Sequence, residues 1–282
     1  MHEIIFYGSF LVFPFILFFI FFKKINIFIR IFFILLSVLF IWMRFIEPQI
    51  IIVKNEKIEV GFESKIILIS DLHLGKYKTE KFLSKAVEKI NNLEADYVFI
   101  AGDFTYQPEL KDLEKLFAPI WEINKPVYWV LWNHDVEKPG PKLRDELKIV
   151  LDNLWTNYLN NTTVNLGTFT LVGLGSNWNR EDDTSLLQEF TPSDNIIVLA
   201  HNPDTTLKYS NNVADLTLAG HTHGWQLRIP GVYKSVIPTT GTFDKWFSQE
   251  ASTKLYVSSW IWETAIPMRF LNFPEIVVLE LY

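Results

Sequence analysis

The chain has 282 residues, with 26 Lys and Arg against 32 Asp and Glu, which gives a formal net charge of −6. The lack of Cys excludes disulfides, thiolate metal sites and cysteine nucleophiles. Charged residues make up 21% of the chain, and with only 13 Pro and 12 Gly this composition excludes a disordered or collagen-like protein. The acidic balance also disfavours sequence-independent binding of nucleic acid, which requires a cationic face.

The N-terminal segment is strongly apolar, and 13 of the 24 Phe lie in the first 46 residues. Residues 4–22 carry no charge, and a second apolar run over residues 25–46 follows Lys23 and Lys24. Since about 20 apolar residues suffice for a helix to cross a bilayer, we predict a two-helix transmembrane anchor over these two ranges. A cleavable signal peptide fits badly, because the chain starts with Met-His-Glu rather than with a basic segment.

The charges around these spans bear on membrane topology. Lys23, Lys24 and Arg30 favour a cytoplasmic loop and a catalytic domain on the extracytoplasmic side, although basic residues at 44–57 nearly balance that count. We therefore expect a multi-pass protein of the cytoplasmic membrane with the lipid bilayer as partner. Residues 1–46 carry +3, so the total of −6 leaves −9 on residues 47–282. The spans, and not electrostatics, would hold this acidic part at the membrane.

After the spans we predict a connecting segment over residues 47–61 and a globular domain over residues 62–282. Short apolar runs that are typical of strands alternate with stretches of helical spacing. The strands are expected at 50–53, 65–69, 97–100, 127–131, 196–200, 215–219, 255–258 and 276–281, with a pair of strands over 162–172 broken at Leu166-Gly167. The helices are expected at 82–90, 110–117 and 142–151. This alternation predicts a layered α/β fold, in which ligands bind at the carboxyl ends of strands.

Polar clusters follow the predicted strands, and they contain five of the six His. Each cluster alone is explained by a turn former, a helix cap or a partly buried His. Together, with no Cys, they form a nitrogen and oxygen ligand set that suits two divalent ions of Mn, Fe or Zn. The clusters are Asp71-x-His73, Gly102-Asp103, Asn133-His134-Asp135, His201 and Gly220-His221-x-His223.

In residue types and in order, these clusters resemble the five motifs of the calcineurin-like metallophosphoesterases over residues 62–282. The segments at 220–230, 256–258, 268–270 and 274–276 resemble those of the membrane-associated bacterial branch. The resemblance implies a four-layer α/β/β/α sandwich. It also implies that a metal-bridging hydroxide attacks the phosphorus of a phosphoester or pyrophosphate.

The resemblance further assigns roles to residues. Asp71, His73 and His223 would hold the first metal, Asn133, His201 and His221 the second, and Asp103 would bridge the two. His134 would stabilise phosphoryl charge or protonate the leaving oxygen, with Asp135 orienting its ring. Arg228 would neutralise a substrate phosphate or form a structural salt bridge.

Four Trp stand where this family usually has Gly, namely Trp132, Trp225, Trp260 and Trp262. They are either ordinary buried aromatics or a distortion of the metal-binding turn. Our hypothesis is that they form an apolar wall at the mouth of the site for a lipid-linked phosphate, since Trp suits the membrane interface.

These features predict a membrane-anchored, metal-dependent phosphoesterase, a hydrolase acting on a lipid-linked or envelope substrate. A more specific alternative is hydrolysis of UDP-2,3-diacylglucosamine in lipid A synthesis, a role known for some relatives of this branch. An alternative of another class is a membrane scaffold with an impaired metal site, which Trp132 makes credible. A nuclease is disfavoured by the acidic domain.

Overall fold

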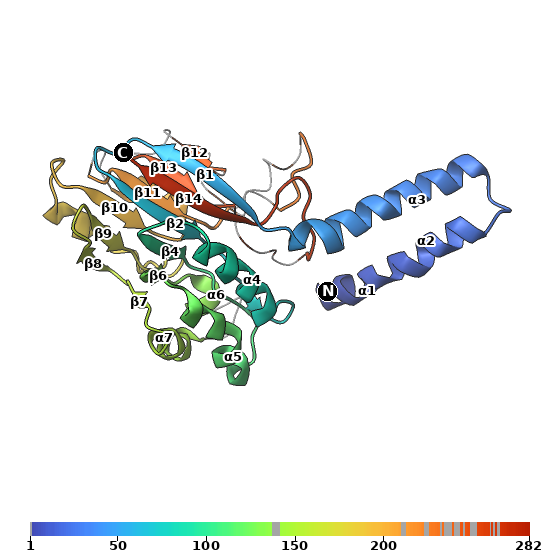
Figure 1. Ribbon diagram of the computed structural model, residues 1–282, viewed down its shortest axis with the longest axis horizontal. Coiled ribbons are helices and arrows are strands. Elements are labelled where there is room, and N and C mark those ends of the chain that lie inside the picture. Colours follow the sequence, from blue (N-terminus) through green and yellow to red (C-terminus); the bar gives the residue numbers. More distant parts are fainter. Residues whose placement is uncertain are drawn as a thin grey trace.

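The protein was analysed as a computed structural model. The structure describes residues 2–136, 142–209, 213–222, 226–231, 233, 239, 243–244, 246–248, 253–259, 261, 263 and 266–282. A helical hairpin projects from one side of a layered α/β domain, and the N-terminus lies at the end of the hairpin nearer the domain (Figure 1).

Two six-stranded sheets form the centre of the domain. The first has the order β1-β14-β2-β4-β6-β7 and the second the order β12-β13-β11-β10-β9-β8. The first comprises β1 (Ile52–Ile58), β14 (Glu275–Leu281), β2 (Ser64–Ile69), β4 (Tyr97–Ala101), β6 (Val127–Val130) and β7 (Asn157–Tyr158). The second comprises β12 (Trp246–Ser248), β13 (Leu255–Val257), β11 (Leu216–Ala219), β10 (Ile196–Leu199), β9 (Thr170–Gly173) and β8 (Thr162–Asn165). Strands β2, β4, β6 and β7 are parallel, as are β9, β10, β11 and β13.

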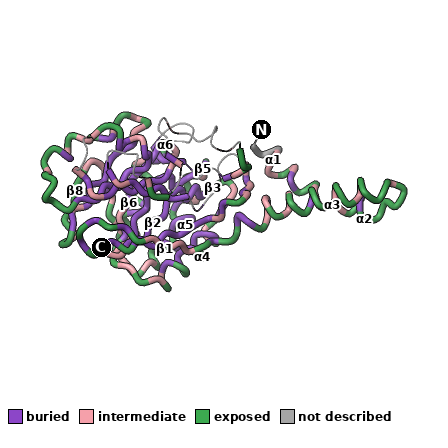
Figure 2. Tube along the Cα trace, turned by 90° about the horizontal axis from the view of Figure 1, so that it is seen from above, coloured by how far each residue is buried: buried purple, intermediate pink, exposed green. Residues whose placement is uncertain are grey.

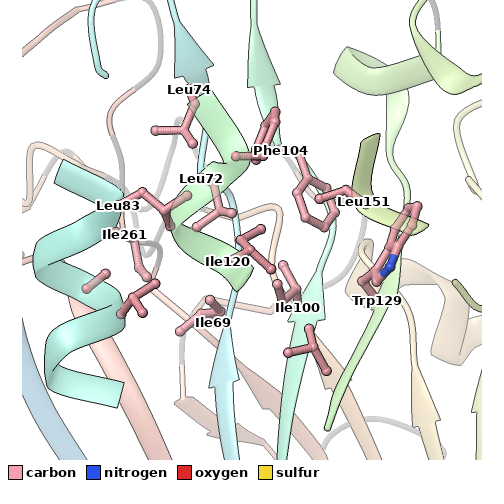
Figure 3. Packing of buried hydrophobic residues seen from close by; sticks show 14 of the residues in the cluster. Ile69, Leu72, Leu74, Leu83, Ile100, Phe104, Ile120, Trp129, Leu151 and Ile261 are labelled. Carbon is pink, nitrogen blue, oxygen red and sulfur yellow. The ribbon is translucent and has the colours of Figure 1, made fainter. Parts of the chain in front are cut away.

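Strand side chains alternate between the two faces of the first sheet, as a pleated strand requires. In β2, Ile67 and Ile69 belong to the cluster formed with α4 (Glu80–Asn91), α5 (Leu113–Phe117) and α7 (Arg144–Asp152). Figure 3 shows part of this cluster. Ile66 and Leu68 instead pack toward the second sheet. The helices therefore cover the outer face of the first sheet, and the inner faces of the two sheets meet.

The outer face of the second sheet differs from the expected layer of α-helices. Its side chains form a cluster that includes Val172, Val198 and Leu187. In the part of the chain that the structure describes, the 3-10 helix Thr184–Glu189 contributes Leu187 to this cluster, and Tyr209, which follows the 3-10 helix Pro203–Lys208, packs against it. The α/β/β arrangement is thus present, and its fourth layer consists of short turns.

The hairpin consists of α1 (His2–Gly8), a 3-10 turn (Ser9–Leu11), α2 (Val12–Phe21) and α3 (Ile27–Ile41). The second arm continues through a π turn (Trp42–Ile46) and a 3-10 turn (Glu47–Gln49). By length and composition this arm of 23 residues, Ile27–Gln49, is one helix able to cross a membrane, and the apolar helix Ile5–Phe21 is shorter. Figure 2 shows how largely the hairpin is exposed.

Part of the predicted connecting segment belongs to the first sheet, because β1 pairs in parallel with β14. The end of the hairpin is also held by buried polar contacts. The Glu47 carboxylate accepts hydrogen bonds from the Trp42 indole and from the backbone N–H of Asn272, each of 2.8 Å. The backbone N–H of Arg269 donates to the carbonyl of Met43 over 2.8 Å. The long helix thus enters the domain at a fixed point.

Candidate metal centre

The predicted ligands that the structure describes follow the carboxyl ends of parallel strands, on loops or, for Asn133, at the start of the short helix α6 (Asn133–Val136). Asp71 and His73 follow β2, Asp103 follows β4, Asn133 follows β6, and His201 and His221 follow β10 and β11. Backbone hydrogen bonds join the first two loops, from Asp71 N–H to the carbonyl of Gly102 (2.8 Å) and from His73 N–H to that of Asp103 (3.0 Å). The pairing continues as a two-stranded sheet of β3 (Leu74–Gly75) and β5 (Thr105–Tyr106).

Four of these residues have a left-handed backbone conformation, which is uncommon for residues other than Gly. Their φ angles are +56° at Asp71, +39° at His73, +56° at Asp103 and +69° at His221. Such strain persists only where the surrounding structure imposes it, and it gathers at functional sites. The sharp turns direct these side chains toward one another.

Two glycines allow the loops to approach closely. A Cβ at Gly220 would lie 2.5 Å from Oδ2 of Asp71, and one at Gly102 would lie 3.0 Å from Nδ1 of His201. Gly102 also has a φ of +80°. The absence of a side chain at both positions lets the ends of the two sheets meet.

The backbone orients two of the His rings. Nδ1 of His73 lies 3.3 Å from the carbonyl oxygen of Thr105, and Nδ1 of His201 bonds the carbonyl of Ala101. A proton on Nδ1 that is donated to a carbonyl leaves the lone pair on Nε2, the usual arrangement of a metal-binding His. Both Nε2 atoms face the carboxylates.

Asp103 lies between these two imidazoles. Its Oδ2 is 3.5 Å from Nε2 of His73 and 3.6 Å from Nε2 of His201. Nε2 of His201 is also 3.5 Å from Oδ1 of Asp71. These separations exceed hydrogen-bond lengths, and they place one carboxylate oxygen between ligands that we assigned to different metals.

The ionisable groups are almost completely buried, and burial disfavours their charged forms. It raises the pKa of Asp71 and Asp103 well above the usual range, and for Asp103 the charges of Asp71 and Asp135 raise it further. Burial also lowers the pKa of His73 and His201 well below the usual range. Burial thus favours uncharged side chains throughout the cluster, and a bound cation would be needed to keep the two Asp ionised.

The donor set fits divalent cations. Asp71, Asp103 and His201 can each offer one ligand atom, and these atoms lie within 4.8 Å of one another. Within the described part of the chain, Oδ1 of Asp71, Oδ1 of Asp103, Oδ1 of Asn133 and Nε2 of His201 are buried without a hydrogen-bond partner. Buried polar atoms are rarely left unsatisfied, and these electron-pair donors are of the kind that a divalent cation accepts.

His134 lies at the edge of this cluster. Its ring centroid is 5.0 Å from that of His73 and 6.0 Å from that of Tyr106, a neighbour that the sequence patterns did not single out. Burial lowers the pKa of His134 to about 4, so the ring is neutral near pH 7. It would therefore act as a hydrogen-bond donor more readily than as an acid.

Asp135 does not orient the ring of His134, contrary to our expectation. Its carboxylate accepts hydrogen bonds from the N–H groups of Phe104 and Thr105, the hydroxyl of Thr105 and the N–H of Trp132, over 3.0–3.4 Å. Burial raises its pKa to about 6. Asp135 instead joins the loop after β4 to the loop after β6, and thereby fixes Asp103 relative to Asn133.

Of the two roles expected for Arg228, the structure shows the salt bridge and not a contact with the metal cluster. Its guanidinium forms two hydrogen bonds of 2.9 Å with the Asp244 carboxylate. Its charged end also lies 4.1 Å from the centre of the Tyr233 ring. This bidentate pair is a structural salt bridge.

Trp132 does not form a wall at the mouth of the site, because it is only 1% exposed. Its ring stacks on His201, with centroids 4.7 Å apart and an interplanar angle of 27°. It also meets the edge of His221 at 5.1 Å. Trp132 is thus packed among the ligands. The other three predicted wall residues, Trp225, Trp260 and Trp262, lie outside the described residues. The predicted ligand His223 does so as well.

Comparison with known proteins agrees with this geometry. Residues 64–225 match the family described as calcineurin-like phosphoesterase. The chain belongs to this family. This family is metal-dependent, so the chain is classed as a hydrolase, and Asp71, Asp103 and His201 lie close enough together to hold a metal ion.

Individual relatives share this assignment. The metallophosphoesterase YkuE of Bacillus subtilis is 29% identical over 258 residues, 85% of this chain and 88% of that protein. The metallophosphoesterase Cj0846 of Campylobacter jejuni is 28% identical, over 83% of this chain and 63% of that protein. A protein of Chlamydia muridarum named UDP-2,3-diacylglucosamine pyrophosphatase LpxG is 24% identical, over 67% of this chain and 74% of that protein.

Proposed function

We propose that the protein is a membrane-anchored phosphoesterase that uses two divalent cations to hydrolyse a phosphoester or pyrophosphate bond of a lipid-linked substrate. The observation that carries the proposal is the position of Asp103, whose Oδ2 lies between the Nε2 atoms of His73 and His201. A carboxylate that lies between two imidazoles is well placed to bridge two metal ions.

The chain offers ligands for both cations. Asp71 and His73 would hold one, Asn133, His201 and His221 the other, with Asp103 shared. His223 would complete the first set. When bound, two such cations, Mn, Fe or Zn, would lower the pKa of a water molecule and neutralise charge on the phosphoryl group.

The protein's own groups would bind and orient the phosphate. A neutral His134 can donate one hydrogen bond to a phosphoryl oxygen at the edge of the cluster. Asp135 holds the loops that carry Asp103 and Asn133, and Trp132 excludes water from one side of His201. Low exposure of these groups strengthens each electrostatic contact with the substrate.

Several contacts support anchoring by the hairpin. The guanidinium of Arg30 donates to the carbonyls of Phe19 (2.8 Å) and Ile20 (2.6 Å), so the second arm caps the end of the first. At the other end, Nε of Arg44 donates to the hydroxyl of Ser9 over 3.0 Å. Both arms expose apolar side chains, for example Phe28 at 77%, which a bilayer would cover. We therefore propose that both arms span the membrane.

An aromatic line supports a lipid-linked substrate. Phe6 of the hairpin stacks on Tyr77 with centroids 4.4 Å apart, Tyr77 lies 5.8 Å from Tyr106, and Tyr106 lies 6.0 Å from His134. Phe6 and Tyr77 are partly exposed. Rings that lead from the membrane segment to the metal cluster would accommodate the apolar part of a substrate drawn from the bilayer.

A narrower candidate is the pyrophosphate bond of UDP-2,3-diacylglucosamine, favoured by the name of the Chlamydia relative. This substrate is both acylated and nucleotide-linked, so it fits the aromatic line. It would require a cytoplasmic active site, whereas Lys23 and Lys24 at the hairpin tip favour the opposite orientation.

The test is a hydrolysis panel with the full chain in lipid nanodiscs and added Mn. The substrates are a diacyl phosphate, UDP-2,3-diacylglucosamine and the soluble bis(p-nitrophenyl) phosphate. Asp103→Asn should lower hydrolysis of every substrate by about 100-fold or more. Equal rates in wild type and Asp103→Asn would contradict the metal mechanism. No hydrolysis of any phosphoester by the metal-loaded wild type would favour the scaffold alternative.

Tyr77→Ala tests the lipid part of the proposal. We expect a higher KM for the acylated substrates and an unchanged KM for the soluble diester, because only acyl chains would reach this ring. Trp121→Ala is the matched control, since Trp121 is 59% exposed and its ring lies 6.4 Å from that of Trp155 in a tilted arrangement. Equal effects of Tyr77→Ala on all substrates would argue against the aromatic line as an acyl-chain site.

A further inference from the structure

The indole of Trp132 places a hydrogen-bond donor among the buried polar atoms of the metal cluster. Its Nε1 is buried and has no hydrogen-bond partner within the described part of the chain. Other unsatisfied atoms there are Oδ1 of Asp71, Asp103 and Asn133 and Nε2 of His201, which can all bind a cation, and Oγ of Ser70, a hydroxyl that can donate or accept. An indole N–H only donates, so a metal ion cannot satisfy it.

The surroundings of Trp132 distinguish it from an ordinary core residue. It follows β6 directly and contacts the rings of His201 and His221, at 4.7 and 5.1 Å between centroids. Its neighbours Leu131 and Val136 belong to the hydrophobic cluster under the helices, whereas Trp132 is a member of no hydrophobic cluster among the described residues. The ring therefore lies within the polar site.

Trp129, which lies in β6 itself, gives the comparison. It is also completely buried, but its Nε1 donates to the hydroxyl of Thr156 over 2.8 Å, and its ring stacks on Tyr158. The buried indole N–H of Trp129, which has no place in the site, thus has an acceptor within the core. Leaving a buried N–H without an acceptor is costly, so the unsatisfied indole of Trp132 indicates an acceptor that arrives with a ligand.

The geometry points to Trp132 as a substrate-contacting residue: its indole N–H donates a hydrogen bond to a phosphoryl oxygen of the bound substrate. This inference rests on the proposed phosphoesterase function. An anionic oxygen is the acceptor that a cluster binding two cations would draw into the site. The stacked ring of His201 fixes the indole plane, so the donor is already oriented before the substrate binds.

The variant that separates donation from packing is Trp132→Phe, which keeps an aromatic ring beside His201 and removes the N–H. A hydrogen bond to a charged group of this kind is expected to change affinity by about ten- to a hundred-fold. Trp132→Phe should therefore raise the inhibition constant of inorganic phosphate by at least about ten-fold and lower kcat/KM by a similar factor. Its affinity for Mn, measured by calorimetry, should stay within about three-fold of wild type.

A direct readout is the indole ¹H–¹⁵N resonance of Trp132 in the full chain labelled with [¹⁵N]Trp, assigned by its loss in Trp132→Phe. We expect it to shift when inorganic phosphate is added to the Zn-loaded protein, since Zn is diamagnetic and leaves this resonance observable. Trp129→Phe is the matched control, and it should lower thermal stability while leaving phosphate inhibition unchanged.

Three results would overturn the inference. They are an unchanged phosphate inhibition constant in Trp132→Phe, an indole resonance that phosphate leaves in place, and a loss of Mn affinity in Trp132→Phe as large as in Trp132→Ala. The last would assign the ring to ligand packing alone. Asp103→Asn separates this failure from that of the proposed function, because it should abolish Mn-dependent hydrolysis even if Trp132 makes no contact with substrate.

Discussion

Replacing Gly220 by Ala should damage the metal cluster through a single methyl group. The new Cβ would lie 2.5 Å from Oδ2 of Asp71 and 2.8 Å from both Cβ and Oγ of Ser70, whereas ordinary contacts begin at 3.4 Å. The Asp71 carboxylate must therefore move by roughly 1 Å, which is large against the ~0.5 Å that a functional site tolerates. The backbone of Gly220 itself accepts Ala, because its φ lies outside the left-handed region.

The expected result is a loss of Mn affinity of about ten- to a hundred-fold, since Asp71 is displaced but not removed. A displacement of about 1 Å at the reacting centre should also cost about 100-fold in activity. Isothermal calorimetry with Mn and hydrolysis of bis(p-nitrophenyl) phosphate measure the two effects.

A second glycine variant controls for general loss of stability. Gly173→Ala would place its methyl group 2.1 Å from Cβ of Leu159 in the core, and no predicted ligand is among the atoms that this methyl group would meet. We expect it to lower the unfolding temperature while the folded protein keeps its Mn affinity. The reasoning about Gly220 is refuted if Gly220→Ala binds Mn as tightly as the wild type, or if Gly173→Ala weakens Mn binding equally.

Three further predictions concern the charged groups and the metal. Arg269→Met should lower the unfolding free energy by about 3–5 kcal/mol, because Arg269 is completely buried and pairs with Glu263 at 3.0 Å. Urea titration measures this loss, and a loss below about 1 kcal/mol would contradict the prediction. Arg228→Gln and Asp244→Asn should have equal, small effects on KM, since both substitutions break the same salt bridge. A raised KM in Arg228→Gln alone would instead indicate that Arg228 binds the substrate phosphate. Removal of metal with EDTA should lower the melting temperature by a few degrees, reversibly on adding Mn at about 100 times its Kd, and Asp103→Asn should show a smaller shift.

The sequence predicted those features that depend on short stretches of chain. The apolar run at 65–69 and the Asp-x-His pair after it are local, and the structure has β2 and its polar loop there. The strand-end position of each ligand follows from the rule that parallel strands end at a common edge. The superfamily could likewise be inferred, because the order of five short motifs is a property of the sequence.

Other features could not be predicted because their partners are distant in the chain. Asp135 lies beside His134 in sequence, yet its carboxylate binds Thr105, which is 30 residues away. Trp132 stacks on His201, and hydrophobicity alone does not distinguish such a stack from a wall at the mouth of a site. The pairing of β1 with β14 joins the two ends of the domain, so no local pattern reveals it.

The most direct measurement is an anomalous difference map from crystals of the Mn-loaded protein. Two peaks about 3.5–4 Å apart are expected, with the Asp103 carboxylate between them and His73 and His201 on opposite sides. A single peak, or two peaks of which neither contacts Asp103, would contradict the proposed two-cation site.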